Sequence, residues 1–306
     1  MAADSQETLE VPIVIAGEQR FPDSDEIAKA EQDKRRIRAR QAQNPDSHGT
    51  RTTMAGTIAV DRRNCHRGPL RDNLGWDINA MDELPKYMKT WFQALLEVYD
   101  RMAKELATIG RSSTVSYAKN AMKDAVKTYH EESKWLLDYQ SKGLAPTMEE
   151  YTKIAFDSTT YPMLTMASFI GMGEIATEQD FDWLIGKPQM LQAACLTLRF
   201  MANIATHQFE RQRQHIPSAV ECMILENGVS EEEACRELNK QVEDAWSDLN
   251  AAFFDPQSPP MPLPLRVLNF ARVVEQLYKA GDDGFTDSIN TKRYLVSLLV
   301  DPVQII

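Results

Sequence analysis

The chain has 306 residues, of which 43% are hydrophobic and 26% are charged, a composition typical of a globular protein with one large domain or two ordinary ones. Its 34 basic and 45 acidic residues leave a net charge of −11, which argues against nucleic acid as a partner. No apolar run is long enough to span a membrane, and the polar start of the chain is not typical of a signal peptide. The four cysteines have no CxxC spacing, so we expect no disulfide scaffold and a reducing, cytoplasmic compartment.

The first 75 residues differ from the rest of the chain in composition. Only Val11–Ala16 is strand-like; an acidic patch, a basic run over Lys34–Arg40 and a tract rich in Gln, Asn, Ser, Gly and Thr follow it. Such a sequence buries too little apolar surface to fold alone. We expect residues 1–75 to form an irregular, largely disordered extension with one short helix over residues 25–43. The basic run is more simply explained as solvated than as an anion-binding element.

From Trp76 onward, the periodicity predicts an all-α bundle of about eight helices. Apolar residues recur at helical spacing through residues 84–109, where Gly110 ends the helix, and a second long helix covers residues 115–139. Capping-box sequences and helix-opening prolines predict further helix starts at Thr147, Thr177, Pro188, Pro217 and Ser230.

Two interruptions divide this bundle. Ser158–Pro162 breaks a helix because the proline removes a backbone donor, while the neighbouring hydroxyl groups can bond to the freed carbonyls. A proline-rich linker over residues 256–264 precedes two last helices, at residues 265–279 and about 290–300, which are joined by the loop 281–284.

One predicted helix carries a narrow polar stripe. Within Leu196–Glu210, this polar stripe consists of Arg199, Asn203, Thr206 and Glu210, whose spacings of four, three and four place them on one helix face. A cation, an amide, a hydroxyl and a carboxylate together suit an anion and a hard metal ion such as Mg²⁺. The commoner explanation for such a stripe, taken alone, is the solvent-facing side of an amphipathic helix.

Two other groups of polar residues are weaker candidates for a site. Asp282 and Asp283 lie between glycines, which favours a turn over a metal site. His207 and His215 are eight residues apart and have no evident third ligand, so a zinc site is not predicted. The sequence contains no phosphate-binding glycine loop, dinucleotide fingerprint or nucleophile elbow.

Several strings, taken in order, resemble one protein family. They are WDINAMDELPKYM at residues 76–88, FIGMG at 169–173, HIPSAVEC at 215–222, NGVSEE at 227–232 and LLVDP at 298–302. Together they resemble the C-terminal half of plant class I terpene synthases, and specifically sesquiterpene synthases of the δ-cadinene synthase kind. The resemblance covers residues 76–306 and implies an incomplete terpene-synthase α-domain, the metal-binding helical bundle of the family; residues 1–75 do not match it.

This resemblance implies a metal-dependent chemistry. Family members ionise a prenyl diphosphate, typically farnesyl diphosphate, with the help of Mg²⁺, for which Mn²⁺ is the alternative ion. Metals and basic residues hold the leaving pyrophosphate, and an aromatic pocket steers the carbocation. The implied partner is therefore a prenyl diphosphate, with neither nucleic acid nor a membrane span involved.

The resemblance also assigns roles to the polar stripe. In the family motif (N,D)D(L,I,V)x(S,T)xxxE, the ligand positions fall on Ala202, Thr206 and Glu210, and Arg199 matches the arginine that binds the diphosphate. This implies Thr206 and Glu210 as metal ligands. Ala202 has no donor atom, and Asn203 is a weak substitute because it lies about 100° round the helix from position 202. The aspartate-rich motif of the family has no counterpart, since residues 57–69 hold a single aspartate.

Further family positions fall near the end of the chain and at the helix break. Tyr278, Asp283 and Phe285 occupy the catalytic aromatic and aspartate positions of the family, with Phe285 in place of a frequent tyrosine. Ser158–Tyr161 matches the helix break that lines the active site, whose carbonyls can stabilise cations. For each of these residues, ordinary core packing is the alternative explanation.

The sequence therefore predicts a terpene synthase by family, a carbon–oxygen lyase that acts on diphosphates, with degraded metal motifs. The alternative is a catalytically inactive fragment or pseudoenzyme of the same family; an unrelated helical scaffold is disfavoured by the ordered series of matching strings. Because the family's helices that pack against residues 84–109 and 115–139 are missing, we expect exposed apolar surface and non-specific oligomerisation.

Overall fold

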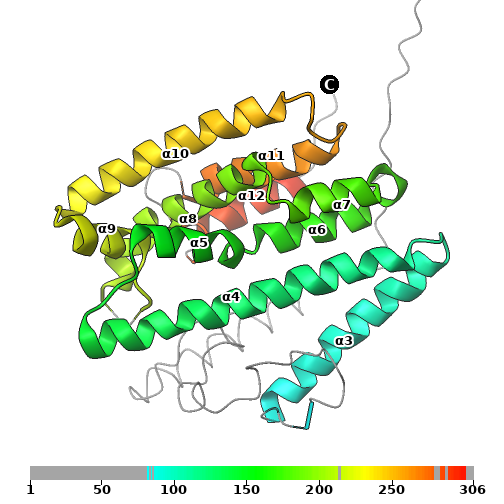
Figure 1. Cartoon of the computed structure of the whole chain (residues 1–306), viewed down its shortest axis with the longest axis horizontal. Helices are drawn as coiled ribbons and strands as arrows, with labels where there is room; N and C mark the ends of the chain where they lie inside the picture. The colour runs from blue at the N-terminus through cyan, green and yellow to red at the C-terminus, as the bar shows by residue number, and fades with distance from the viewer. Residues whose placement is uncertain are drawn as a thin grey trace, which may run out of the picture. The chain divides into compact units, whose positions relative to one another are not determined.

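The computed structural model describes residues 81–82, 84, 86–212, 215–278, 283–286 and 289–300, with elements labelled as in Figure 1. Every regular element among these residues is a helix, which confirms the predicted all-α class. The strand-like Val11–Ala16, the helix expected over residues 25–43 and the rest of the extension 1–75 lie outside the described residues.

The described part of the chain has ten α-helices, against about eight expected, and they include the two short helices on either side of the predicted break after Ser158. The α-helices are α3 (Lys86–Ala107), α4 (Val115–Lys142), α5 (Met148–Ser158), α6 (Tyr161–Gly171), α7 (Glu178–Ile185), α8 (Gln189–Glu210), α9 (Ala219–Asn227), α10 (Glu231–Phe253), α11 (Leu263–Tyr278) and α12 (Ile289–Leu299). Two 3₁₀ turns, Ser112–Thr114 and Gly173–Ile175, connect neighbouring helices.

Local sequence signals account for most helix ends. At the start of α5, the Thr147 hydroxyl accepts a hydrogen bond from the Glu150 N–H, and the Glu150 carboxylate accepts one from the Thr147 N–H at 3.0 Å. The same capping box opens α10 at Ser230. At the end of α9, Gly228 adopts a left-handed conformation with φ +66°, which lets its N–H bond to the Ile224 carbonyl.

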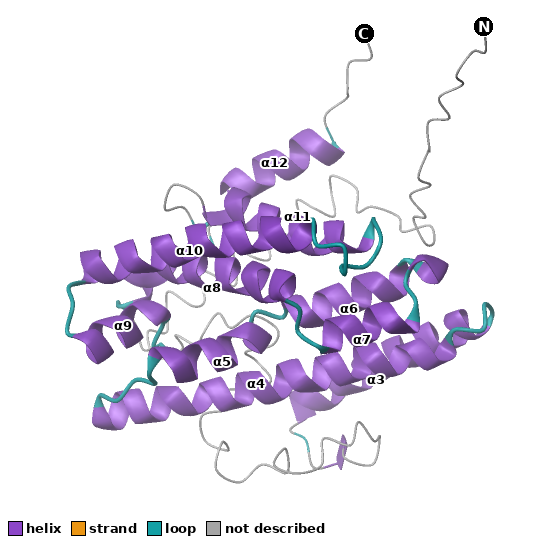
Figure 2. Ribbon diagram, turned by 45° about the horizontal axis from the view of Figure 1, so that its top comes forward, coloured by secondary structure: helices purple, strands orange, loops and turns teal. Residues whose placement is uncertain are grey.

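Helix α8 is the central element of the described bundle. It packs against α5, α9, α10 and α11, and Figures 1 and 2 show it between α10 and α5. Its residues belong to two core clusters: Met190, Leu191 and Cys195 pack with α6, α7 and α11, while Phe200 packs with α5, α9 and α10. Full burial of one such side chain stabilises the fold by about 1.5–3 kcal/mol. Because α8 has core on two sides, little of its surface is left for polar residues.

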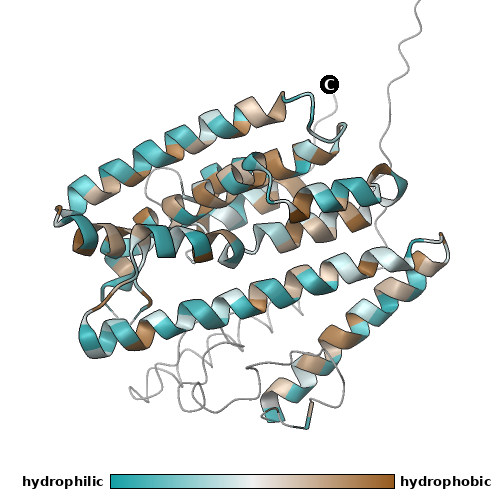
Figure 3. Ribbon diagram, in the orientation of Figure 1, coloured by the Kyte–Doolittle hydropathy of each residue, from teal (hydrophilic) through white to brown (hydrophobic). Residues whose placement is uncertain are grey.

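Helix α10 shows how the outer helices divide their surfaces. Its buried residues recur every three or four positions, which is one stripe of a helix, and they are Ala234, Leu238, Val242, Ala245 and Leu249. Figure 3 shows the side of α10 that faces the viewer as mostly hydrophilic. The buried stripe of α10 thus covers α8, while its charged residues face water.

Exposed apolar side chains gather on α12. None of its described residues is buried, and the side chains of Leu298 and Leu299 are more than three-quarters exposed. The sequence predicts apolar exposure on the surfaces of α3 and α4, where Val98 and Leu137 are exposed as well. Oligomerisation through these surfaces stays a prediction.

Two further predictions concern the chain as a whole. Among the residues that the structure describes, no helix combines the length and apolarity that crossing a membrane requires. The three cysteines in the described ranges, Cys195, Cys222 and Cys235, are free thiols, as expected; Cys65 lies outside those ranges.

Candidate functional site

The polar stripe lies entirely on α8, as the sequence predicted, but its members have different surroundings. Asn203 is buried, whereas Thr206 and Glu210 are partly exposed, and Glu210 is the last residue of the helix. The guanidinium of Arg199 is mostly covered. The stripe therefore does not face open solvent along its length, which removes the simplest explanation offered by its sequence.

Asn203 is held by two other helices. Its Oδ1 accepts a hydrogen bond from the Tyr151 hydroxyl of α5 at 2.6 Å and another from the Ala219 N–H, at the start of α9, at 3.1 Å. An amide oxygen has two lone pairs, and both are used here. The side chain thus ties α5 and α9 to α8, and no lone pair of that oxygen is left for a metal ion.

The same end of α8 meets a second buried polar group, Glu221 in the first turn of α9. One oxygen of this carboxylate lies 3.0 Å from Nδ1 of His207 and 3.0 Å from Nε2 of His215. The other oxygen accepts a hydrogen bond from the Ser218 N–H at 2.9 Å and caps α9. Burial by itself raises the pKa of Glu221, but the hydrogen bonds from His215 and Ser218 outweigh it and lower that pKa to about 2.

We call the set Tyr151, Asn203, His207, Ala219 and Glu221 the Asn203 junction. The sequence offered no third partner for His207 and His215; the structure supplies the Glu221 carboxylate, in a helix-capping role. Within the described residues, no group of three or more His, Cys, Asp or Glu side chains is arranged to hold a metal ion. The contacts of the junction connect α5, α8 and α9.

The Thr206 side chain donates a hydrogen bond, whereas the Asn203 oxygen accepts two. Its hydroxyl donates to the Ala202 carbonyl, one turn earlier on α8, at 2.9 Å. Because the proton is engaged, the lone pairs of the hydroxyl oxygen stay available to accept from a donor or to bind a cation. Ala202 itself is partly buried against the apolar core and contributes no side-chain donor.

Arg199 reaches from α8 to the helix break and to α4. Its Nη2 donates to the Ser158 hydroxyl at 2.5 Å, and its Nη1 lies 3.7 Å from Oε1 of Glu132. The Nε of Arg199 is buried and has no hydrogen-bond partner. Burial by itself would lower the pKa of Arg199, but Glu132 and two tyrosines, Tyr151 and Tyr129, raise it, so the guanidinium stays charged.

The break between α5 and α6 places Ser158 next to Arg199. Thr160 has a left-handed backbone with φ +65°, an unusual conformation for a β-branched residue that costs about 1–3 kcal/mol. The Tyr161 hydroxyl donates to the Phe270 carbonyl of α11 at 2.9 Å and so fixes the start of α6. The sequence predicted this break, and the structure adds that it is strained.

Tyr278 is the last residue of α11 and lies near the polar stripe. Burial raises the pKa of its phenol to about 12; the charges of Asp283 and Glu210 add to that effect, and Arg199 opposes it. The charges of the predicted residues Arg199, Glu210 and Asp283 thus all act on the Tyr278 phenol. We call Glu132, Ser158, Arg199, Glu210 and Tyr278 the Arg199 cluster.

A tight turn positions the residues that follow α11. Oδ1 of Asp283 accepts a hydrogen bond from the Thr286 N–H at 3.0 Å. The Gly284 N–H donates to the Leu277 carbonyl at 2.7 Å, and the Thr291 hydroxyl donates to the Gly284 carbonyl at 2.7 Å. Phe285 is 62% exposed, so its ring is not part of the core. Asp282 lies outside the described residues.

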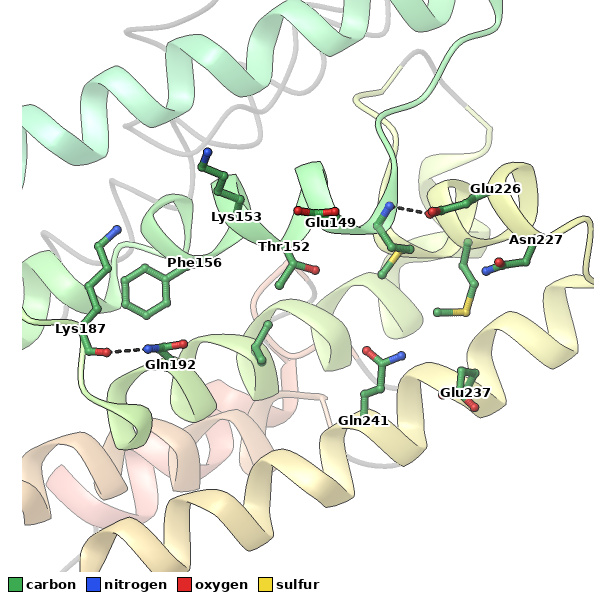
Figure 4. A pocket seen from close by; sticks show the side chains of 13 residues that line it. Glu149, Thr152, Lys153, Phe156, Lys187, Gln192, Glu226, Asn227, Glu237 and Gln241 are labelled. Carbon is green, nitrogen blue, oxygen red and sulfur yellow. Dashed lines mark hydrogen bonds between the residues drawn. The ribbon is translucent and has the colours of Figure 1, made fainter.

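A cavity of about 770 Å³ lies among α5, α8, α9 and α10, and none of the predicted site residues lines it. Figure 4 shows Lys153 and Lys187 toward one end and Glu226 and Glu237 toward the other. The Lys187 ammonium is paired with Asp157 at 2.8 Å. This mixture of opposite charges does not suit a diphosphate, so we do not assign the cavity to the site.

Sequence reasoning did not single out Glu132, Tyr151 or Glu221. For Glu132 a signal was present, because it continues the spacing of buried positions along α4, which are Ala125, Thr128, Glu132 and Leu136. A carboxylate in a core position of a helix requires a partner. For Glu221, the signal was the sequence Ser218-Ala-Val-Glu221, a capping box.

The comparisons with known proteins all find members of one family. Residues 63–248 match the family model described as "Terpene synthase family, metal binding domain". The (−)-germacrene D synthase of Vitis vinifera is 44% identical to this chain over 231 residues, which cover 75% of this chain and 41% of the relative. The (+)-δ-cadinene synthase isozyme A of Gossypium arboreum is 41% identical over 231 residues, with 75% and 41% covered.

A solved structure shares the fold. The crystal structure of isoprene synthase from grey poplar leaves (Populus x canescens), in complex with three Mg²⁺ ions and dimethylallyl-S-thiolodiphosphate, matches with a TM-score of 0.66 at 24% identity. The match covers 75% of this chain and 43% of that one. The chain described here spans about two-fifths of the length of the curated relatives that it matches.

Proposed function

Because the chain belongs to the terpene synthase family, we propose that it carries the metal-binding part of a site that ionises and cyclises a prenyl diphosphate, with farnesyl diphosphate as the favoured substrate. The observation that supports this proposal is the Arg199 cluster. It combines a charged guanidinium, a carboxylate on the same face of α8 and a neutral phenol at the end of α11.

In this proposal Thr206 and Glu210 hold one Mg²⁺ ion. The donor set fits a hard cation, since a carboxylate and a hydroxyl whose proton is engaged elsewhere both offer oxygen lone pairs. Mn²⁺ accepts the same oxygen ligands and is the alternative ion. When bound, the ion supplies positive charge that stabilises the departing diphosphate. We assign Asn203 to the fold instead, because its side-chain oxygen already accepts two hydrogen bonds.

The remaining residues bind and orient the substrate. Arg199 presents its guanidinium to the diphosphate, which it can bind through two parallel hydrogen bonds. Tyr278 is neutral at physiological pH, as an ordinary phenol is, and its pKa, raised to about 12, keeps it so at higher pH. It therefore offers a π face to a carbocation rather than a negative charge. Asp283 and Phe285 belong to the turn after α11, where Asp283 fixes the backbone and Phe285 supplies a second aromatic face.

A second function is favoured by one specific feature, the alanine at position 202. This position lies one turn before Thr206 on α8 and has no atom that can bind a metal ion. A site with two ligands retains the ion less firmly than a site with three. The alternative is therefore a protein that binds a prenyl diphosphate without converting it.

An incubation with substrate distinguishes these functions. The purified chain, farnesyl diphosphate and Mg²⁺ are combined, and the hexane-extractable products are compared with those of a boiled control, while binding of inorganic pyrophosphate is measured by calorimetry. We expect Mg²⁺-dependent binding and a slow formation of hydrocarbon. Binding without product supports the alternative, and the absence of binding contradicts both functions.

Two variants control this experiment. Arg199→Ala removes the guanidinium and is expected to abolish pyrophosphate binding. Arg211→Ala removes an exposed arginine from the residue after α8, where it pairs with Glu231, and is expected to leave binding unchanged. Equal losses in the two variants would show that the chain attracts anions without a specific site.

A further inference from the structure

Glu132 is a buried carboxylate on α4 for which the proposed chemistry has no role. Only 7% of the residue is exposed. The residues one turn before and one turn after it on α4, Thr128 and Leu136, are buried as well. A carboxylate taken out of water without a partner costs several kcal/mol, so its position requires compensation from neighbouring groups. The groups that compensate it belong to the proposed substrate site.

Two residues from other helices face Glu132. Arg199 of α8 places Nη1 3.7 Å from Oε1 of Glu132. Ser158, at the end of α5, lies near enough to the same carboxylate to lower its pKa. Ser158 also accepts a hydrogen bond from Nη2 of Arg199 at 2.5 Å. Ser158 is therefore bonded to the cation and lies beside the anion.

The direct contact between the two charges is a loose one. A charge-assisted hydrogen bond between a guanidinium and a carboxylate is about 2.7–2.9 Å long, well below the 3.7 Å found here. The Nε of Arg199 is buried and has no partner. The guanidinium has five N–H donors, so its hydrogen-bonding capacity is only partly used. An anion with several oxygens, such as a diphosphate, can satisfy these donors better than Glu132 does.

We propose that Glu132 is an internal counter-anion, which holds the Arg199 guanidinium in place until a diphosphate displaces it from that cation. This inference rests on the proposed function of the Arg199 cluster. Glu132 acts through Arg199 and is therefore a positioning residue. Ser158 belongs to the protein and stays beside the carboxylate when the diphosphate arrives, so Glu132 has a polar neighbour in both states.

The proposal has a thermodynamic consequence for anion binding. An anion that must compete with Glu132 binds with an affinity reduced by the fraction of molecules in which Arg199 is free. Removing the charge of Glu132 removes this competition. The affinity for pyrophosphate should therefore rise, whereas loss of a purely structural contact would lower it or leave it unchanged.

The test is calorimetric titration of the full chain with inorganic pyrophosphate at pH 7, with and without Mg²⁺. Glu132→Gln keeps the shape of the side chain but removes its charge, and we expect pyrophosphate to bind about three- to tenfold more tightly than to the unmodified chain. Glu131→Gln is the matched control, because it removes the same charge from the neighbouring position, about 100° round α4. This control should change the affinity little.

Each outcome has a separate meaning. Equal or weaker binding by Glu132→Gln, while the unmodified chain binds pyrophosphate, overturns the counter-anion role and leaves the proposed function standing. The counter-anion role is also overturned if Glu132→Gln binds pyrophosphate more tightly than the unmodified chain without Mg²⁺ but more weakly with Mg²⁺. The carboxylate would then be needed to bind the metal. No binding by either protein overturns the substrate site itself, and the counter-anion with it.

A second variant serves if Glu132→Gln does not fold. Glu132→Asp keeps the charge but withdraws it by one methylene from Nη1 of Arg199, and a gain in affinity smaller than tenfold is expected. A loss of pyrophosphate affinity in this variant, with circular dichroism showing an intact helical fold, contradicts the proposal.

Discussion

Asn203 and Thr206 lie one turn apart on the same face of α8, and the fold uses them in opposite ways. In the Asn203 junction, the side-chain oxygen accepts hydrogen bonds from Tyr151 and Ala219, which use both of its lone pairs. Near the Arg199 cluster, Thr206 donates its proton to its own helix and keeps its lone pairs. A shared helix face therefore does not give a shared role; the donors that neighbouring helices bring to each residue decide it.

The two regions also differ in how completely their charges are paired. Glu221 in the Asn203 junction is surrounded by donors, and its pKa is lowered to about 2. Glu132 in the Arg199 cluster has one cation at 3.7 Å, and burial raises its pKa although Arg199 opposes that effect. A buried carboxylate that accepts several hydrogen bonds, as Glu221 does, stabilises the fold, whereas a cation with unused donors, as Arg199 is, can accept a ligand. The following predictions test this difference.

The largest effect is expected for Asn203→Ala. The change leaves the Tyr151 hydroxyl and the Ala219 N–H buried without an acceptor, so unfolding in urea should show a loss of about 3–4 kcal/mol. Asn203→Asp keeps an acceptor for both donors and should cost less than Asn203→Ala, although burial of the new carboxylate adds a cost of its own. If Asn203→Ala lost stability only in the presence of Mg²⁺, the residue would be a metal ligand rather than a connection between helices.

A smaller effect on the free energy of unfolding is expected when the pH is lowered and the Glu221 carboxylate is protonated. Its folded-state pKa of about 2 lies below the ordinary value of 4.5, so its contribution is present above pH 4.5 and is lost as the pH falls through 2. The contribution should amount to about 2–3 kcal/mol. Urea unfolding of the unmodified chain and of Glu221→Gln between pH 7 and pH 3 should therefore converge as the pH falls.

Glu233 is the matched control for this measurement. It occupies the same capping-box position at the start of α10 but is exposed, and its pKa is lowered by hydrogen bonds from Ser230. Glu233→Gln should change the pH dependence much less than Glu221→Gln does. Equal changes in the two variants would mean that burial in the Asn203 junction adds nothing to helix capping.

A local effect is expected for Gly284→Ala, in the turn that carries Asp283. A methyl group at this position would lie 2.8 Å from the Leu277 carbonyl oxygen and 2.9 Å from the Thr291 hydroxyl, so the turn must move. We expect a loss of about 1–2 kcal/mol and faster amide hydrogen exchange in α12.

Gly171→Ala controls for the added methyl group, since nothing lies within 4 Å of that position at the end of α6. It should be neutral or stabilising by less than about 1 kcal/mol. Unchanged hydrogen exchange in α12 of Gly284→Ala would mean that the turn is not fixed by this close approach.

The smallest effect on stability is expected for Thr206→Val. The hydroxyl bonds only to the carbonyl of its own helix, so its removal should cost less than about 1 kcal/mol. Binding of pyrophosphate in the presence of Mg²⁺ should nevertheless weaken about tenfold or more. A variant that loses stability but keeps Mg²⁺-dependent binding would reverse the contrast between Thr206 and Asn203.

The sequence by itself determined the family and most of the helices. Ordered strings such as FIGMG at 169–173 and HIPSAVEC at 215–222 predicted a terpene synthase, which the family match and the curated relatives confirm. Capping boxes at Thr147 and Ser230 predicted where α5 and α10 begin. These features are local or depend on order along the chain, so they can be found without knowing which helices meet.

Only the tertiary structure decided which contacts each residue of the polar stripe makes. Asn203 and Thr206 have the same periodicity and similar polarity, and the difference between them comes from Tyr151 and Ala219, which lie 52 and 16 residues from Asn203 along the chain. The partner of Glu132 is likewise far along the chain, on α8. A hydrogen bond depends on distance and direction in space, and helical spacing fixes these within one helix but not between helices.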